Sequence, residues 1–231
     1  MDIYKEQTVA EVVSGNVGAD HVFSKYNIDF CCGGNVTLEK ACQEKGITFE
    51  VLKKEIETLV NSISNETNFS EMDEISIINY AQNVFHNYFK ENIPLVSALA
   101  LKVAEVHWKQ HKEVIEINNL FNQIVPELNE QMAAEEKNLF PILKKETLQR
   151  KETELKSVVK TTQNMENVDK QIGVVFKRLA NLTNSYTPPV GACNTFKLLY
   201  EKLHEVELKL HNYMHFEINI LFPRVLKKLK S

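Results

Sequence analysis

The chain has 231 residues, enough for one medium domain or for a small and a larger domain together. Its hydrophobic fraction of 43% supports a real core, and only 7 Gly and 6 Pro favour long helices. A net charge of −4 gives no nucleic-acid footprint, and no apolar run approaches the roughly 20 residues of a membrane helix. The polar start shows no signal peptide, so we expect a cytoplasmic, all-α protein with reduced thiols and no membrane contact.

Short helices are predicted near the N-terminus, at residues 8–13, 19–26 and 37–44, with glycines between them. Thr37 is expected to cap the third of these helices. A longer amphipathic helix is predicted at residues 48–60, where apolar residues recur on one face. These elements predict a small helical domain over residues 1–62.

Two adjacent cysteines, Cys31 and Cys32, are followed by Gly33 and Gly34. Neighbouring cysteines do not easily bridge each other, because the closed ring strains the peptide between them. The glycines permit a tight loop that leaves both sulfurs accessible, which suits thiol exchange or capture of a soft metal. The alternative is that both are small buried hydrophobes. Cys42 is expected in the core, with a resolving thiol or a third ligand as the alternatives.

Residues 63–73 are polar, lack an apolar face and are predicted to form a linker. Four long helical segments are predicted after it, with Pro94 expected to kink or interrupt the first and Pro126 and Pro141 to disturb the second. Together they predict an up-down-up-down four-helix bundle over residues 74–231. The segments cover residues 74–111, 112–145, 152–183 and 193–230, with a stop at 185–191.

A repeated Leu-Phe-Pro ending suggests two related halves in this bundle. Glu135 and Glu217 each stand six residues before the proline of that ending, and His86 lies among aromatic residues on the first segment. Helical bundles build metal sites from inward-pointing residues on facing helices. Each residue alone also fits a solvated face or a core histidine, but their joint placement favours a metal site.

The segment Asp-Phe-Cys-Cys-Gly-Gly at 29–34, together with the paired Glu…Leu-Phe-Pro helices, resembles the iron–sulfur cluster repair di-iron family, also called the repair-of-iron-centres family. The resemblance covers nearly the whole chain. It implies a small N-terminal cysteine domain and a hemerythrin-like bundle that holds two irons. It also implies iron–sulfur proteins as clients, recovery from nitrosative or oxidative damage, and Cys31 and Cys32 as catalytic residues.

The metal site of this chain departs from the family pattern at half of its inner positions. His86, Glu135 and Glu217 match what the resemblance implies. The expected histidines are replaced by three other side chains. Asp169 and Tyr213 supply oxygen ligands, whereas Gln131 is a weak ligand. Such a site suits Fe(III), with altered redox behaviour, or manganese. The alternative is a bundle that has lost its metal. The replacements are Gln131, Asp169 and Tyr213.

The remaining histidines are not expected to replace the missing ligands. At 100° per residue, His215 lies about 160° and His211 about 120° from Glu217 around the helix. With His204 they form a stripe that we interpret as a polar surface, or as a separate weak site together with His107 and His111. Cys193 begins the last helix, where the dipole favours a thiolate, but lies far from Glu217 and receives no catalytic role.

Three functions remain open from the sequence. In the first, which we favour, the protein supplies iron or electrons to damaged iron–sulfur centres. In the second, a divergent member with a degenerate metal site acts as a thiol-based redox sensor or interaction module. In the third, the bundle binds oxygen or nitric oxide, which requires more histidines than this site has. A homodimer is compatible with each of them.

Overall fold

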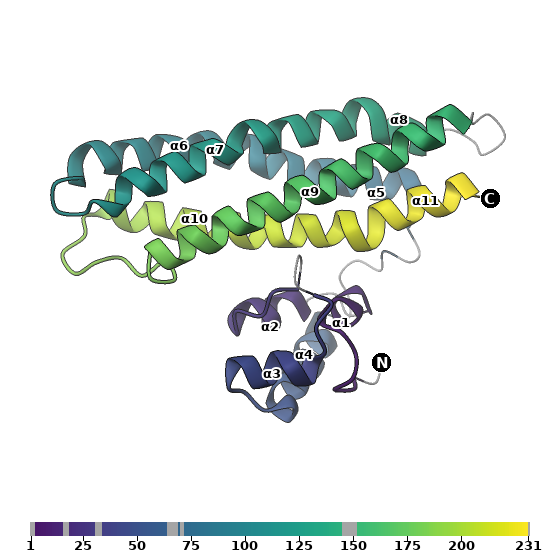
Figure 1. Cartoon of the computed structure of the whole chain (residues 1–231), viewed down its shortest axis with the longest axis horizontal. Coiled ribbons are helices and arrows are strands. Elements are labelled where there is room, and N and C mark those ends of the chain that lie inside the picture. Colours follow the sequence, from purple (N-terminus) through teal and green to yellow (C-terminus); the bar gives the residue numbers. More distant parts are fainter. Residues whose placement is uncertain are drawn as a thin grey trace. The chain divides into compact units, whose positions relative to one another are not determined.

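The computed structural model describes residues 3–15, 19–30, 34–63, 69, 72–144 and 152–230. The chain divides into two compact units, one of Met1–Asp73 with Met214–Arg224 and one of Glu74–Tyr213 with Val225–Ser231. Across the described ranges the chain is helical, and the only extended pairing there is an isolated bridge between Thr8 and Thr37 (Figure 1). The predicted all-α class is therefore confirmed.

The first unit begins with α1 (Val9–Gly15), α2 (Ala19–Lys25), α3 (Leu38–Lys45) and α4 (Phe49–Ile63). Thr37 caps α3 as predicted, because its Oγ1 accepts the backbone N–H of Lys40 at 3.3 Å. A reciprocal capping box precedes α1, where Thr8 Oγ1 accepts from the Glu11 N–H and Glu11 Oε2 from the Thr8 N–H. These caps satisfy amide groups that a short helix leaves without partners.

One apolar cluster forms the core of these four helices, and Cys42 belongs to it. Its side chain is 3% exposed, and burial raises the pKa of its thiol. The core interpretation of Cys42 is thereby confirmed, and a role as a resolving thiol is disfavoured because the thiolate is destabilised. Cys31 and Cys32 lie outside the described residues. The cluster includes Val9, Val12, Phe23, Phe30, Leu38, Leu52 and Ile56.

Within the first unit, Phe69 and Met72 contact the segment Met214–Arg224. The ring of Phe69 packs edge-on against Phe216, with centroids 5.5 Å apart. Arg224 donates hydrogen bonds to the backbone carbonyls of Phe69 and Met72. This charged donor satisfies two backbone carbonyl groups.

The second unit is built from long antiparallel helical segments (Figure 1). Pro94 and Pro126 lie inside α6 and α7 without ending them, so the interruption considered at Pro94 is absent, whereas a kink there stays a prediction. Both prolines are exposed, so water can reach the carbonyl groups that they deprive of a partner. The segments are α5 (Glu74–Tyr80), η2 (Ala81–His86) and α6 (Asn87–His107); α7 (Glu113–Ala134), η3 (Glu135–Leu139) and α8 (Phe140–Leu143); α9 (Glu152–Leu182); and α10 (Asn194–Phe216), η5 (Glu217–Leu221) and α11 (Phe222–Lys230). Of the last of these, the stretch Met214–Arg224 is counted with the first unit.

Three short π-helical turns, η2, η3 and η5, interrupt the α-helical pattern. At their ends the backbone N–H bonds to the carbonyl five residues earlier, as Phe140 does to Glu135 and Phe222 to Glu217. Pro141 and Pro223 follow directly, and a proline lacks the amide and clashes with the carbonyl four residues before it. Such turns frequently mark functional sites. The Leu-Phe-Pro endings therefore coincide with a local change of helix geometry.

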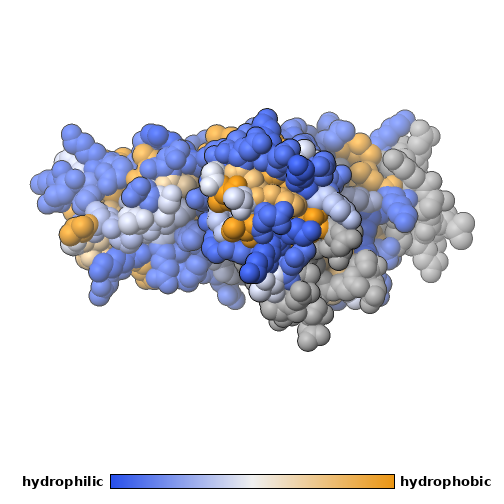
Figure 2. Space-filling view, turned by 90° about the horizontal axis from the view of Figure 1, so that it is seen from below, coloured by the Kyte–Doolittle hydropathy of each residue, from blue (hydrophilic) through white to orange (hydrophobic). Residues whose placement is uncertain are grey.

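The visible face is mainly hydrophilic, with apolar areas interspersed (Figure 2). None of the helices in the described ranges combines the length and the apolar character that crossing a bilayer demands. Large apolar side chains that remain exposed include Leu101, Val106, Trp108, Val174 and Val190.

A half-buried acid, Glu207, lies near the loop that joins α9 to α10. Burial raises its pKa to about 7, against the opposing influence of the Tyr186 phenol. The folded protein therefore keeps the Glu207 proton up to a higher pH than the unfolded chain, in which this carboxyl has its ordinary pKa. The stability that comes from this protonation is lost as the pH rises through about 7. We expect Glu207→Gln to stabilise the protein by about 2 kcal/mol more at pH 8 than at pH 5. Urea unfolding at both pH values measures this, and an equal effect at both would contradict it.

Candidate metal centre

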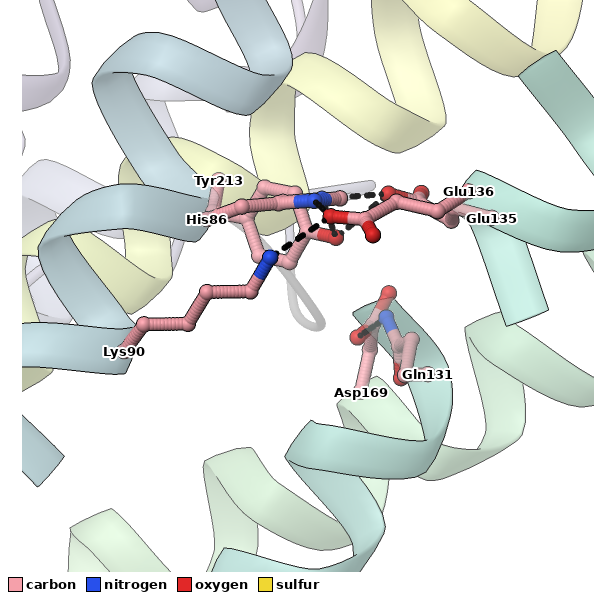
Figure 3. A network of polar contacts seen from close by, with 7 residues as sticks. All are labelled: His86, Lys90, Gln131, Glu135, Glu136, Asp169 and Tyr213. Atoms are coloured by element: carbon pink, nitrogen blue, oxygen red, sulfur yellow. Dashed lines mark hydrogen bonds and ion pairs between the residues drawn. The ribbon is translucent and has the colours of Figure 1, made fainter. Parts of the chain in front are cut away.

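Three buried side chains from three helical segments meet in the bundle unit: His86 at the end of η2, Glu135 at the start of η3, and Tyr213 on α10 (Figure 3). All three are 0% exposed. The Tyr213 hydroxyl donates to Glu135 Oε2 at 2.7 Å, and His86 Nε2 lies 2.8 Å from that oxygen and 3.1 Å from Tyr213 Oη. Their polar atoms thus converge on one point in the core.

The other nitrogen of the His86 ring is held by a second carboxylate. His86 Nδ1 lies 2.8 Å from Glu136 Oε1, and Lys90 Nζ donates to the same oxygen at 2.9 Å. Contact with Lys90 and with His86 lowers the pKa of Glu136, so it remains ionised at neutral pH. A carboxylate on the far nitrogen fixes the orientation of a metal-binding histidine and raises its basicity.

A second polar pair, Gln131 and Asp169, comes from α7 and α9 and points toward this group (Figure 3). Gln131 Nε2 donates to Asp169 Oδ1 at 2.9 Å, and both side chains are buried. Burial raises the pKa of Asp169 to about 7, with a further contribution from the negative charge of Glu135, while the hydrogen bond from Gln131 opposes it.

Glu217 is the first residue of η5 and is 0% exposed. It follows Tyr213 by four residues, which places it one turn further along the same helical segment. The two glutamates of the repeated Leu-Phe-Pro endings therefore occupy equivalent positions, each opening a π-helical turn.

Aromatic rings surround the His86 and Tyr213 side chains. Phe140 stacks on the His86 ring with centroids 5.7 Å apart, and Phe85 and Phe89 lie 5.2 and 5.5 Å from the Tyr213 ring. These rings exclude water and fix the polar atoms, because interior side chains are closely packed. In this low-dielectric surrounding, interactions between charges are stronger than in water.

The donor set suits a hard cation. Glu135 and Asp169 are at most 1% exposed, and buried carboxylates are costly unless they are paired or coordinate a metal. Glu135 Oε1 is buried and has no hydrogen-bond partner among the described residues. Carboxylate and phenol oxygens with one imidazole fit Fe(III) or manganese. Within the described ranges no group of three His, Cys, Asp or Glu side chains could hold a metal ion. A metal site here would therefore also need the Tyr213 phenol, which contacts Glu135, or the Gln131 amide, which contacts Asp169.

Among the described residues, the remaining histidines belong to no group of three or more His, Cys, Asp or Glu side chains that could hold a metal ion. His204 stacks on Tyr186, with ring centroids 5.0 Å apart, and His107 and His111 lie at the turn between α6 and α7. His215 is not the surface residue that the helical stripe predicts. It is half-buried, its Nδ1 accepts from Asn219 at 2.8 Å, and burial lowers its pKa to about 4.

Glu136 and Lys90 are the residues that the sequence interpretation missed. Lys90 lies four residues after His86, and Glu136 directly follows Glu135. The first spacing indicates a shared helix face. For Glu136, the available signal was the pair of adjacent acids at 135 and 136, although the sequence does not say which acid contacts which nitrogen of His86.

Replacement of Glu136 by Gln is expected to lower iron affinity by about 10-fold, because the His86 ring loses the carboxylate that orients it. Lys90→Met is the matched control: it removes the exposed cation but leaves the Glu136–His86 contact, so we expect a change below about threefold. Competition with a metal-binding dye measures both affinities. Equal affinities for Glu136→Gln and the unmodified protein would contradict the positioning role.

Comparison with known proteins yields matches to both parts of the chain. A family model described as "Hemerythrin HHE cation binding domain" matches residues 80–225, and one described as "Domain of Unknown function (DUF542)" matches residues 5–60. "Iron-sulfur cluster repair protein ScdA" of Staphylococcus haemolyticus is 32% identical, over 96% of this chain and 99% of the relative. "Probable iron-sulfur cluster repair protein" of Haemophilus influenzae is 30% identical, over 97% and 99%. "Iron-sulfur cluster repair protein YtfE" of Pectobacterium atrosepticum is also 30% identical, over 97% and 98%.

Proposed function

The chain belongs to the iron-sulfur cluster repair proteins, and from this membership we propose that it holds iron in its helical bundle and supplies iron or electrons to damaged iron–sulfur proteins. The observation that carries the proposal is the buried group of His86, Glu135 and Tyr213, whose nitrogen and oxygen atoms converge within 3.1 Å of one another. A core that holds so many polar atoms together is costly without a ligand.

The proposed ligands are His86, Glu135 and Glu217, with Asp169, Tyr213 and Gln131 as additional oxygen donors. His86 would bind through Nε2, because Glu136 holds Nδ1. Tyr213 holds its proton toward Glu135 Oε2 until that site is filled. Bound iron supplies Lewis acidity and one-electron chemistry. The aromatic rings of Phe85, Phe89 and Phe140 exclude water from these atoms.

We further propose a division of labour along the chain. Residues 1–62 would form a thiol domain in which Cys31 and Cys32 exchange electrons with a client or receive a cluster from it. Residues 63–73 would connect it to the bundle of residues 74–231. A thiolate is the nucleophile and soft-metal ligand that this exchange needs. A cytoplasmic location and a homodimer belong to the same proposal.

The proposal is tested by elemental analysis of protein expressed in iron-supplemented medium, followed by reactivation of a nitric-oxide-inactivated iron–sulfur enzyme. We expect near two irons per chain and reactivation that depends on them. A fully folded protein that takes up no metal would contradict the metal centre.

The second candidate is a thiol-based sensor or interaction module on a metal-free scaffold. It is favoured by the loss of three histidines to Gln131, Asp169 and Tyr213, two of which already pair with each other. This candidate expects cysteine reactivity that is unchanged by iron chelators. Loss of client reactivation after chelation would exclude it.

A further inference from the structure

A second reactive group lies at the opposite end of α10 from Tyr213. Cys193 directly precedes α10, twenty residues before Tyr213, which corresponds to about 30 Å along the helix. The loop before α10 and the turn between α6 and α7 lie at the same end of the bundle (Figure 1). Cys193 Sγ lies 3.3 Å from His107 Nε2, a contact between residues 86 positions apart in sequence. We infer that Cys193 and His107 form a thiol–imidazole pair that reacts with small anionic disulfides.

The imidazole of His107 is held in place by its neighbours. Phe196, in the first turn of α10, lies 5.2 Å from the rings of both His107 and His111. Glu113 Oε1 lies 3.1 Å from His111 Nδ1, which anchors the second ring. A nucleophile within hydrogen-bond distance of an oriented base is the geometry of an activated thiol.

The exposure of Cys193 and the positive helix N-terminus beside it favour reaction with an anionic partner, although Glu113 and Glu116 at the start of α7 offset part of the nearby positive charge. Cys193 is exposed, whereas Cys42, the other cysteine in the described part of the chain, is buried. The first turn of α10 contains no acidic residue, so its partial positive charge is not offset there. Lys109, Lys112 and Lys197 are exposed in the adjoining turn and in α10. Cations and a helix N-terminus stabilise both a thiolate and the carboxylates of a small disulfide.

The reaction is a thiol–disulfide exchange that balances without a further redox agent. His107 Nε2 takes the proton of the Cys193 thiol, and Sγ attacks one sulfur of the small disulfide. The disulfide bond breaks as the bond from Cys193 Sγ to that sulfur forms. The departing thiolate takes the proton from His107 and leaves as a thiol. Cys193 is oxidised, half of the small disulfide is reduced, and a second thiol reverses the step. This chemistry is independent of the metal centre.

The test uses the full-length chain carrying Cys31→Ser and Cys32→Ser, treated with glutathione disulfide and followed by intact-protein mass spectrometry. We expect one glutathione per chain, located at Cys193 by peptide mapping and released by dithiothreitol. Adding His107→Gln is expected to slow modification at least ~10-fold, because the general base is lost. Adding His204→Gln instead is the matched control, because His204 lies on α10 about 16 Å from Cys193 along the helix and stacks on Tyr186. Its modification rate is expected to remain within about twofold of that of the parent protein.

Chemical rescue separates base catalysis from a structural role of His107. In the His107→Ala variant, added imidazole is expected to restore at least half of the lost rate, and melting curves show whether the variant is folded. An equal rate in His107→Gln and its parent would overturn the inference. So would a slow His107→Ala protein that imidazole does not accelerate, or modification of Cys42 in preference to Cys193.

Discussion

Replacing Tyr213 with Phe is expected to abolish the purple tyrosinate-to-Fe(III) absorption band of the iron-loaded protein and to lower its iron affinity at least ~10-fold. The hydroxyl lost in this variant lies 2.7 Å from Glu135 Oε2 and 3.1 Å from His86 Nε2, at the convergence of the buried donors. The ring that remains keeps its packing against Phe85 and Phe89, so the variant is expected to fold. A visible spectrum with elemental analysis measures both effects.

Tyr200→Phe is the control for this experiment. Tyr200 is also buried and lies on α10, but thirteen residues before Tyr213, or about 20 Å along the helix. It is expected to retain the band and the iron of the unmodified protein. If Tyr213→Phe retained both as well, Tyr213 would not be a ligand, and the proposed oxygen-rich centre would have to be built from the carboxylates and His86 alone.

Simultaneous replacement of Cys31 and Cys32 by Ser is expected to reduce client reactivation at least ~100-fold while leaving the iron content unchanged. A serine hydroxyl is a poor nucleophile and does not bind soft metals, so it cannot replace a thiolate in exchange or cluster capture. Reactivation of a nitric-oxide-inactivated iron–sulfur enzyme measures the first effect, and elemental analysis measures the second.

Cys42→Ala provides the comparison, because Cys42 is buried in the core of the first unit and its thiol pKa is raised by that burial. It is expected to keep reactivation within about threefold of the unmodified protein, apart from a modest loss of stability for the smaller side chain. Undiminished reactivation by the Cys31→Ser, Cys32→Ser variant would assign the repair chemistry to the bundle. Loss of iron from that variant would instead couple the thiols to the metal centre.

The helical elements could be predicted because their signals are local. Thr37 caps α3 through an atom three residues away, and the polar stretch before Glu74 contains no apolar face. The predicted interruption at Pro94 failed because a proline's effect depends on where its freed carbonyl points. Lys90, whose carbonyl loses its partner, is exposed, so water can satisfy that group. Similarly, the sequence pattern of α10 does not indicate that the His215 side chain is half-buried and that burial lowers its pKa.

By itself the sequence determined the chemical inventory: the adjacent cysteines, a single histidine among aromatic residues, and two glutamates at equivalent places before a proline. The tertiary structure decided which atoms of that inventory meet. Glu135 and Glu136 are adjacent in sequence, yet each contacts a different nitrogen of His86, and Cys193 meets His107 from 86 residues away. Periodicity fixes which face of a helix is apolar, whereas the rotation, the register and the π-helical turns of packed helices decide which side chains face each other across the core.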